Sequence, residues 1–181
     1  REGMIPGPGG LCDQIVVSTK DLFLIPDGIS YEEASLTEPL ACCVHSIEIG
    51  DIQLGDDVVV IGGGIMGINH VMLAKRKGAR VIISEVDEER RKLALSLGAD
   101  VAINPMECDV VEKVKELTGG RGADVVFNTT AIPSVVPEAI AMTGSFGKMV
   151  QYSSMHPDAP VPVSPQMLHS TQKILTGSIS P

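Results

Sequence analysis

A run of glycines in the middle of the chain has the spacing of a phosphate-binding loop. The stretch Gly62-Gly63-Gly64-Ile65-Met66-Gly67 matches the pattern G-x-G-x-x-G and lies between an apolar run and a helical pattern. In such a loop Gly62 would permit a tight turn, Gly64 would let the backbone approach a pyrophosphate, and Gly67 would let helix and strand pack closely. The start of the following helix offers free N–H groups and a partial positive charge to phosphates.

An acidic residue after the next apolar run strengthens this interpretation. Glu85 lies 18 positions beyond Gly67, where a carboxylate can accept hydrogen bonds from a ribose diol and would repel a 2′-phosphate. We therefore expect NAD rather than NADP as coenzyme. A glycine-rich turn beside a solvated acid is the plainer alternative, but it leaves the order strand, loop, helix, strand, acid unexplained. Arg90 is a candidate to lie over the adenine, although a surface role within the charged run 87–91 explains it nearly as well.

Strands and helices are expected to alternate from residue 56 onward. Apolar runs predict strands at 58–61, 80–84, 101–103, 125–128, 148–152 and near 174–179, and helical patterns occur at 66–77, 87–97, 110–117 and 135–142. This alternation is typical of an α/β, doubly wound parallel sheet, the Rossmann fold. Ligands of such sheets bind at the carboxyl ends of the strands. Thr129, Thr130 and Ser153, which follow two of these strands, are therefore expected to face the coenzyme together with Ile65 and Met66 of the loop.

The first part of the chain has a different pattern. We expect a short strand at 14–17, a turn at 25–28 and a short helix opened by a capping box of Ser30 and Glu33. Pro39 is expected to separate that helix from a second one at 40–49.

Composition argues against two classes of partner. The net charge is −9, and the chain has two tyrosines, three phenylalanines and no tryptophan, so it lacks the basic and stacking groups of nucleic-acid-binding proteins. The longest uncharged stretch, residues 58–74, is interrupted by glycines, Asn69 and His70, and it is shorter than the roughly 20 apolar residues of a membrane span. Cysteines at 12, 42, 43 and 108 have no CxxC spacing, which favours reduced thiols and a cytoplasmic protein.

Several stretches together resemble the zinc-dependent medium-chain alcohol and polyol dehydrogenases, in particular their sorbitol dehydrogenase-like branch. The stretches are Leu24–Ser30, Leu36–Cys42, the glycine loop, Leu97–Asp100, Ile103–Pro105 and Gly120–Val125. Their order and spacing are specific, and together they cover nearly the whole chain.

The resemblance implies an enzyme that transfers a hydride from a secondary alcohol or polyol to NAD, with zinc held mostly by a separate catalytic domain. It suggests that residues 1–30 are the tail of that domain and a linker, and that residues 31–181 are an NAD-binding Rossmann domain truncated at its C-terminal end. By the same resemblance Glu38 matches a glutamate at the catalytic zinc, as a ligand or through the zinc-bound water; a helix-end acid is the alternative. Cys42 falls beside the nicotinamide ring, although a structural thiol is an equally good account.

The resemblance also implies homo-oligomers that pair through the Rossmann domain, near residues 159–163. We expect no dehydrogenase turnover from this segment alone. Two other functions remain open: a nucleotide-binding module without catalysis and an S-adenosylmethionine-binding domain. The latter usually has G-x-G-x-G, which lacks the packing role of Gly67. His45 and His70 fall in predicted helices, where histidine more often packs than catalyses, and neither is assigned a role.

Overall fold

The computed structural model describes residues 12–158 and 160–179. They divide into two compact units, one up to Leu36 and one from Thr37 onward. The first unit contains a 3-10 helix, Thr19–Asp21, and the short helix α1, Tyr31–Ala34. The expected capping box is present, because Ser30 Oγ accepts the Glu33 N–H at 3.1 Å and the Glu33 carboxylate accepts the Ser30 N–H at 2.8 Å.

The strand expected at residues 14–17 is not formed, so that prediction was wrong. These residues are exposed, and Val16 is 100% exposed. Because a strand is stabilised by hydrogen bonds and side-chain pairs with a neighbouring strand, an apolar run without such a neighbour does not become one. Residues 1–11 of the predicted N-terminal segment lie outside the described part of the chain.

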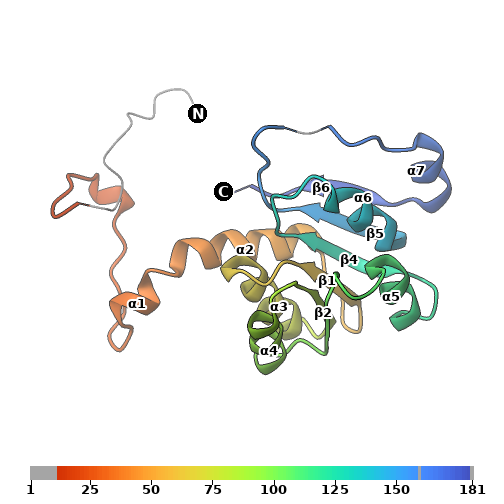
Figure 1. The fold of residues 1–181 in the computed structure, drawn as a ribbon. Helices are drawn as coiled ribbons and strands as arrows, with labels where there is room; N and C mark the ends of the chain where they lie inside the picture. The colour runs from red at the N-terminus through yellow and green to blue at the C-terminus, as the bar shows by residue number, and fades with distance from the viewer. Residues whose placement is uncertain (1–11, 159, 180–181) are drawn as a thin grey trace. The chain divides into compact units, whose positions relative to one another are not determined.

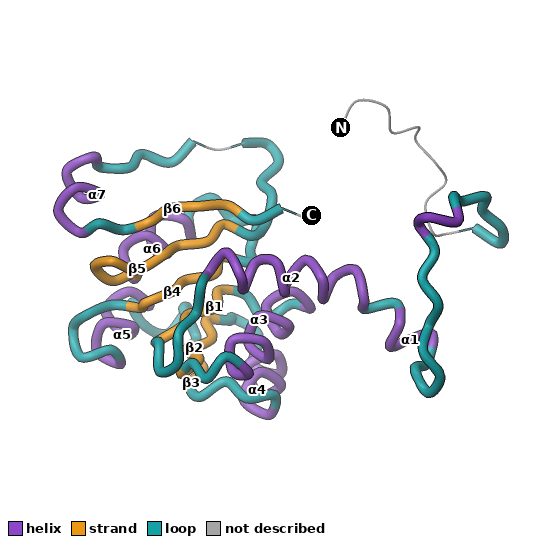
Figure 2. Tube along the Cα trace, turned by 180° about the vertical axis from the view of Figure 1, so that it is seen from behind, coloured by secondary structure: helices purple, strands orange, loops and turns teal. Residues whose placement is uncertain are grey.

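The second unit is built on a six-stranded parallel sheet with the order β3-β2-β1-β4-β5-β6 (Figure 1; β3 is labelled in Figure 2). The strands are β1 Asp57–Ile61, β2 Arg80–Ser84, β3 Val101–Ile103, β4 Ala123–Asn128, β5 Thr143–Gln151 and β6 Ile174–Gly177. All five residues of β1 are buried, and the last four form the apolar run that the centre of a parallel sheet requires. The predicted α/β, doubly wound Rossmann fold is confirmed.

Helices cover both faces of the sheet (Figure 2). Alternate residues of β1 belong to different cores: Val58 and Val60 pack with α2, α3 and α4, whereas Val59 and Ile61 pack with α5 and α6. The helices of this unit are α2 Thr37–Gly50, α3 Ile65–Arg76, α4 Glu88–Ser96, α5 Val110–Leu117, α6 Val135–Met142 and α7 Pro165–Thr171. None of the helices in the described ranges is long and apolar enough to cross a membrane.

Several element ends differ from the sequence-based expectation by one or two residues, and the larger differences concern α2, β5 and α7. Helix α2 begins at Thr37, before Pro39, because proline is tolerated in a first turn where its missing N–H would have no helical partner. Strand β5 begins at Thr143, with a register shift against β4. Helix α7 was not predicted, although Ser164 caps it and Pro165 stands at its first position, both of which are helix-start signals.

Candidate functional site

The glycine loop makes the turn from β1 into α3. Gly62 has a φ of +97°, a value that favours glycine, and its N–H donates to the Ser84 carbonyl oxygen at 2.9 Å. A Cβ added to Gly67 would lie 1.8 Å from the Gly62 carbonyl oxygen, so no side chain fits there. A Cβ added to Gly64 would meet no atom within 4 Å. The loop is therefore packed tightly on its inner side, and the backbone at Gly64, which caps α3, is open to an incoming group.

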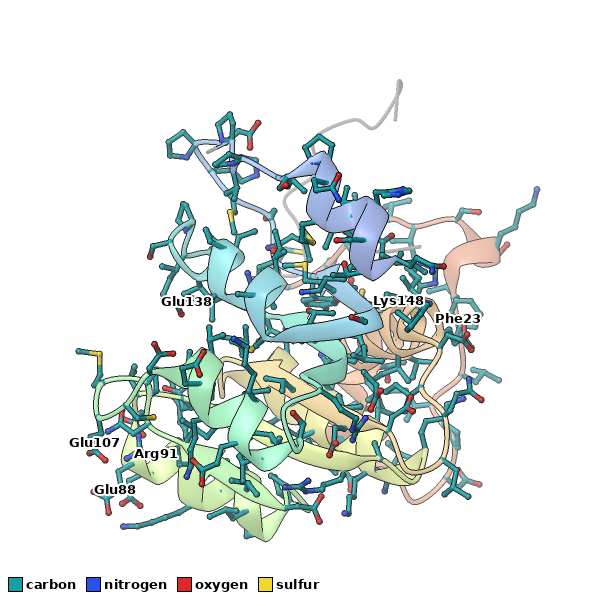
Figure 3. All side chains as sticks on the ribbon, turned by 90° about the vertical axis from the view of Figure 1, so that its right-hand side faces the viewer. Phe23, Glu88, Arg91, Glu107, Glu138 and Lys148 are labelled. Carbon is teal, nitrogen blue, oxygen red and sulfur yellow. The ribbon has the colours of Figure 1, made fainter. Side chains whose placement is uncertain are left out.

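Glu85 follows β2 and is turned toward this loop. The residue is buried, and its carboxylate accepts hydrogen bonds from the N–H of Gly63 and, at 2.8 Å, from the N–H of Asp87. Arg91, labelled in Figure 3, holds the backbone behind it by donating to the carbonyl oxygens of Glu85 at 2.8 Å and Val86 at 2.6 Å. Each carboxylate oxygen accepts one bond from the protein and retains a further lone pair for a ligand hydroxyl.

A cavity of about 350 Å³ lies against the glycine loop and Glu85. Six of the ten predicted coenzyme residues line it. They are Gly62 and Gly64 of the loop, Glu85 after β2, Arg90 of α4, and Thr129 and Thr130 after β4. Its other walls include apolar residues from three further segments: Pro105, Val110, Ile132, Val135 and Met142. A mostly apolar cleft with a few polar groups is the usual form of a small-molecule site. We call it the adenosine-side cavity, after the ligand portion that it is proposed to hold below.

The two threonines of this cavity use their hydroxyl protons within the protein. Thr129 Oγ1 donates to the Ile61 carbonyl oxygen at 2.7 Å, and Thr130 Oγ1 donates to Asn128 Oδ1 at 2.8 Å. A Cβ at Gly62 would collide with both threonine side chains, at 2.8 and 2.9 Å. The threonines therefore close the rear of the glycine loop and can offer a ligand only their remaining acceptor capacity.

A larger cavity of about 780 Å³ is lined by residues on the other side of the loop. It brings together two further predicted coenzyme residues, Met66 and Ser153, with the predicted metal residue Glu38. Cys42 also lines it, and the Cys42 thiol donates to Glu38 Oε1 at 3.3 Å. We call it the nicotinamide-side cavity, on the same basis. Of the predicted residues, Ile65 and Gly67 line neither cavity: Ile65 is 63% exposed at the start of α3, and Gly67 is buried beneath the loop.

A buried polar cluster behind this second cavity was missed from the sequence. His70 is fully buried in α3, its Nδ1 donates to the Met66 carbonyl oxygen at 2.7 Å, and its Nε2 accepts from Ser46 Oγ at 2.9 Å. Its ring also lies 4.8 Å, centroid to centroid, from that of Tyr152 in an edge-on arrangement. The only sequence signal was a histidine at a buried helix position, which does not identify partners on other elements.

Burial sets the protonation states in this cluster. It lowers the pKa of His70 to about 4, so the imidazole is neutral near pH 7. Burial also raises the pKa of Tyr152, so its phenol remains a hydrogen-bond donor, and raises the pKa of the Cys43 thiol. The cluster is therefore uncharged. Its side chains can hold their neighbours in place, but they are not suited to acid–base catalysis.

The described residues do not by themselves make a zinc site. No group of three or more histidine, cysteine, aspartate or glutamate side chains able to hold a metal occurs within residues 12–158 and 160–179. Glu38 and Cys42 offer two donors, whereas zinc in proteins takes about four ligands. Residues outside the described chain would have to provide the others.

The model of the zinc-binding dehydrogenase family matches residues 66–181, which is more than half of the chain. The chain belongs to that family. Solved structures agree: a provisionally assigned zinc-binding dehydrogenase from Sinorhizobium meliloti, crystallised with NADP, superposes with a TM-score of 0.82 at 29% identity, over 86% of this chain and 46% of that one.

Two curated relatives of this chain, both from Bacillus subtilis, have names that give a polyol or a diol as substrate. A sorbitol dehydrogenase is 34% identical over 80% of this chain and 41% of its own length. An (R,R)-butanediol dehydrogenase is 35% identical over 82% of this chain and 43% of its own length. Across the curated relatives compared, the matched region is between 36% and 49% of their length. The chain thus corresponds to less than half of each.

Proposed function

We propose that this chain is the coenzyme-binding portion of a zinc-dependent oxidoreductase that transfers a hydride from a secondary alcohol or polyol to NAD. The observation that carries the proposal is the Glu85 carboxylate, held against the glycine loop inside a cavity of about 350 Å³. The family and the polyol-dehydrogenase relatives support the reaction class. Because the chain spans less than half of those relatives, the activity belongs to the whole protein, and we expect no turnover from this portion alone.

The coenzyme would extend across both cavities. The adenosine part would occupy the adenosine-side cavity, its ribose hydroxyls would donate to Glu85, and Arg90 would lie near the adenine. The pyrophosphate would pass over Gly64, where free N–H groups at the start of α3 favour negative charge. The nicotinamide would then lie in the nicotinamide-side cavity, near Met66 and Ser153.

NAD is proposed over NADP on the basis of one residue. A 2′-phosphate placed at the ribose would bring its charge next to the buried Glu85 carboxylate, and like charges in a partly desolvated site repel strongly. Since the S. meliloti relative was crystallised with NADP, the family alone does not set this preference. It depends on Glu85.

Zinc would be bound mainly by residues outside the described chain. We propose that Glu38 stands beside the metal, as a ligand or through its bound water, since it faces the cavity assigned to the nicotinamide. Within the described residues, the two donors Glu38 and Cys42 do not complete a metal site.

A small alcohol or polyol is the proposed substrate, and pairing of copies through the Rossmann domain near residues 160–163 is the proposed assembly; Ala159 lies outside the described residues. A cytoplasmic location is proposed because Cys42, Cys43 and Cys108 are thiols rather than disulfides.

Calorimetric titration of the 181-residue chain with NAD, NADP and S-adenosylmethionine tests the proposal. We expect NAD to bind at least about tenfold more tightly than NADP, equivalent to about 1.4 kcal/mol, and S-adenosylmethionine not to bind. Tighter binding of NADP would overturn the role of Glu85. Binding of S-adenosylmethionine alone would overturn the oxidoreductase assignment.

A further inference from the structure

Tyr152 connects the end of β5 to the glycine loop by a side-chain contact. Its hydroxyl donates to Met66 Sδ at 3.3 Å, and both residues line the nicotinamide-side cavity. Cys43 Sγ lies 3.8 Å from the Tyr152 hydroxyl and 3.7 Å from the Met66 carbonyl oxygen. The cavity has lining residues from α2, α3 and the segment after β5, and Cys43, which is not itself a lining residue, joins α2 to Met66 and Tyr152 of the other two segments.

His70 fixes the same two residues from behind. Its Nδ1–H holds the Met66 carbonyl oxygen, and its ring packs edge-on against the Tyr152 ring. The imidazole is itself oriented by Ser46 of α2 and lies 4.9 Å from the Phe127 ring of β4. Because His70 is fully buried, the Tyr152 ring has a rigid support that does not depend on solvent.

We propose that Tyr152, held by Met66 and His70, is a positioning residue that orders the wall against which the nicotinamide half of the coenzyme binds. This inference rests on the proposed function. The adenosine-side cavity does not include Tyr152 or Met66 among its lining residues, so the effect should be confined to one half of the dinucleotide. A side chain that is locked before the ligand arrives loses no further freedom on binding, and this preorganisation improves affinity.

The test compares NAD with ADP, a ligand that lacks the nicotinamide half. Tyr152→Phe keeps the ring and removes only the hydroxyl that contacts Met66. We expect NAD to bind about fivefold more weakly, as the loss of one hydrogen bond implies, while ADP affinity stays within about twofold. Tyr31→Phe is the matched control, because Tyr31 is the other tyrosine of the chain and is 83% exposed; it should change neither affinity.

A second variant keeps the proposal testable if Tyr152→Phe fails to fold. Met66→Leu removes the sulfur acceptor and nearly conserves volume, so it should produce the same NAD-specific loss. If the two residues act through one contact, the double variant should lose no more than either single variant.

The outcomes separate this inference from the proposed function. Equal losses for NAD and ADP, unchanged NAD binding in both variants, or additive losses would overturn the positioning role while leaving coenzyme binding intact. A wild-type chain that binds neither ADP nor NAD would overturn the proposed function, and this inference with it. An NAD-specific, non-additive loss supports both.

Discussion

The two cavities on either side of the glycine loop are built in different ways. The adenosine-side cavity is made around backbone at Gly62 and Gly64 and a carboxylate tied to that backbone. The nicotinamide-side cavity is walled by side chains such as Met66 and Tyr152, from segments 86 positions apart. A backbone-built site leaves a local signature in sequence spacing. A site assembled from side chains of distant segments leaves none, and its geometry depends on the core behind it.

The largest effect is expected where the loop itself is broken. Gly67→Ala places a Cβ within 1.8 Å of the Gly62 carbonyl oxygen, which neither backbone segment can avoid without moving. We expect a loss of about 3 kcal/mol in the free energy of unfolding, and loss of both ADP and NAD binding by roughly 100-fold or more. Urea unfolding and calorimetry measure the two effects.

Gly64→Ala is the matched control for that variant. Its Cβ meets no protein atom within 4 Å, so the melting temperature should fall far less than in Gly67→Ala, by no more than the modest difference between glycine and alanine at a helix N-cap. Binding should still fall, since the methyl group would occupy the space through which a pyrophosphate approaches the backbone. Unchanged affinity in Gly64→Ala would show that phosphate does not pass over this residue.

Acid should act on the buried cluster around His70. The pKa of His70 is lowered by burial from 6.5 to about 4, so between these values the unfolded chain binds a proton that the folded chain does not. Stability is therefore retained above pH 6.5 and falls as the pH drops toward 4, by about 3 kcal/mol in total. Denaturant melts from pH 7 to 4 measure it, with His70→Gln expected to flatten this part of the profile. An unaltered slope in His70→Gln would contradict the assignment of the acid sensitivity to the buried cluster.

A smaller effect should separate the two coenzymes. Glu85→Gln keeps the side-chain shape but replaces the charged carboxylate, which accepts hydrogen bonds from the Gly63 and Asp87 N–H groups, by a neutral amide. We expect NAD affinity to fall about tenfold, because hydrogen bonds to a charged group contribute roughly 1.5–3 kcal/mol, and NADP affinity to fall less or rise. Titrations of both coenzymes give the ratio. Glu88→Gln, an exposed neighbour on α4, should leave that ratio unaltered.

The smallest effect is expected at Arg90. Because this residue lines the adenosine-side cavity, Arg90→Ala should weaken ADP and NAD equally, by roughly threefold, as loss of a cation stacked on a ring would. Lys92→Ala, which removes only exposed ion pairs on α4, is the control. A loss for NAD but not for ADP would place Arg90 away from the adenine.

The sequence predicted the sheet and the glycine loop well because both are local patterns. Four strands or helices, at 80–84, 101–103, 110–117 and 135–142, match the predicted bounds. Prediction failed where the outcome depended on neighbours: the run at 14–17 found no strand to pair with, and Pro39 was accommodated in a first turn. His70 could not be understood alone, since its partner Ser46 lies 24 positions away on another helix.

The central place of β1 also has a consequence for the order in which the molecule forms. Asp57 of β1 meets Arg80 of β2 across 23 positions of chain, but Asp124 of β4 only across 67. Shorter loops close sooner, so the β1–α3–β2 segment, with the glycine loop inside it, should gain structure before β5 delivers Tyr152. A nascent chain would thus form its glycine loop while the segment that carries Tyr152 was still being synthesised. Pulse-labelled hydrogen exchange during refolding would show earlier protection in β1 and β2 than in β5.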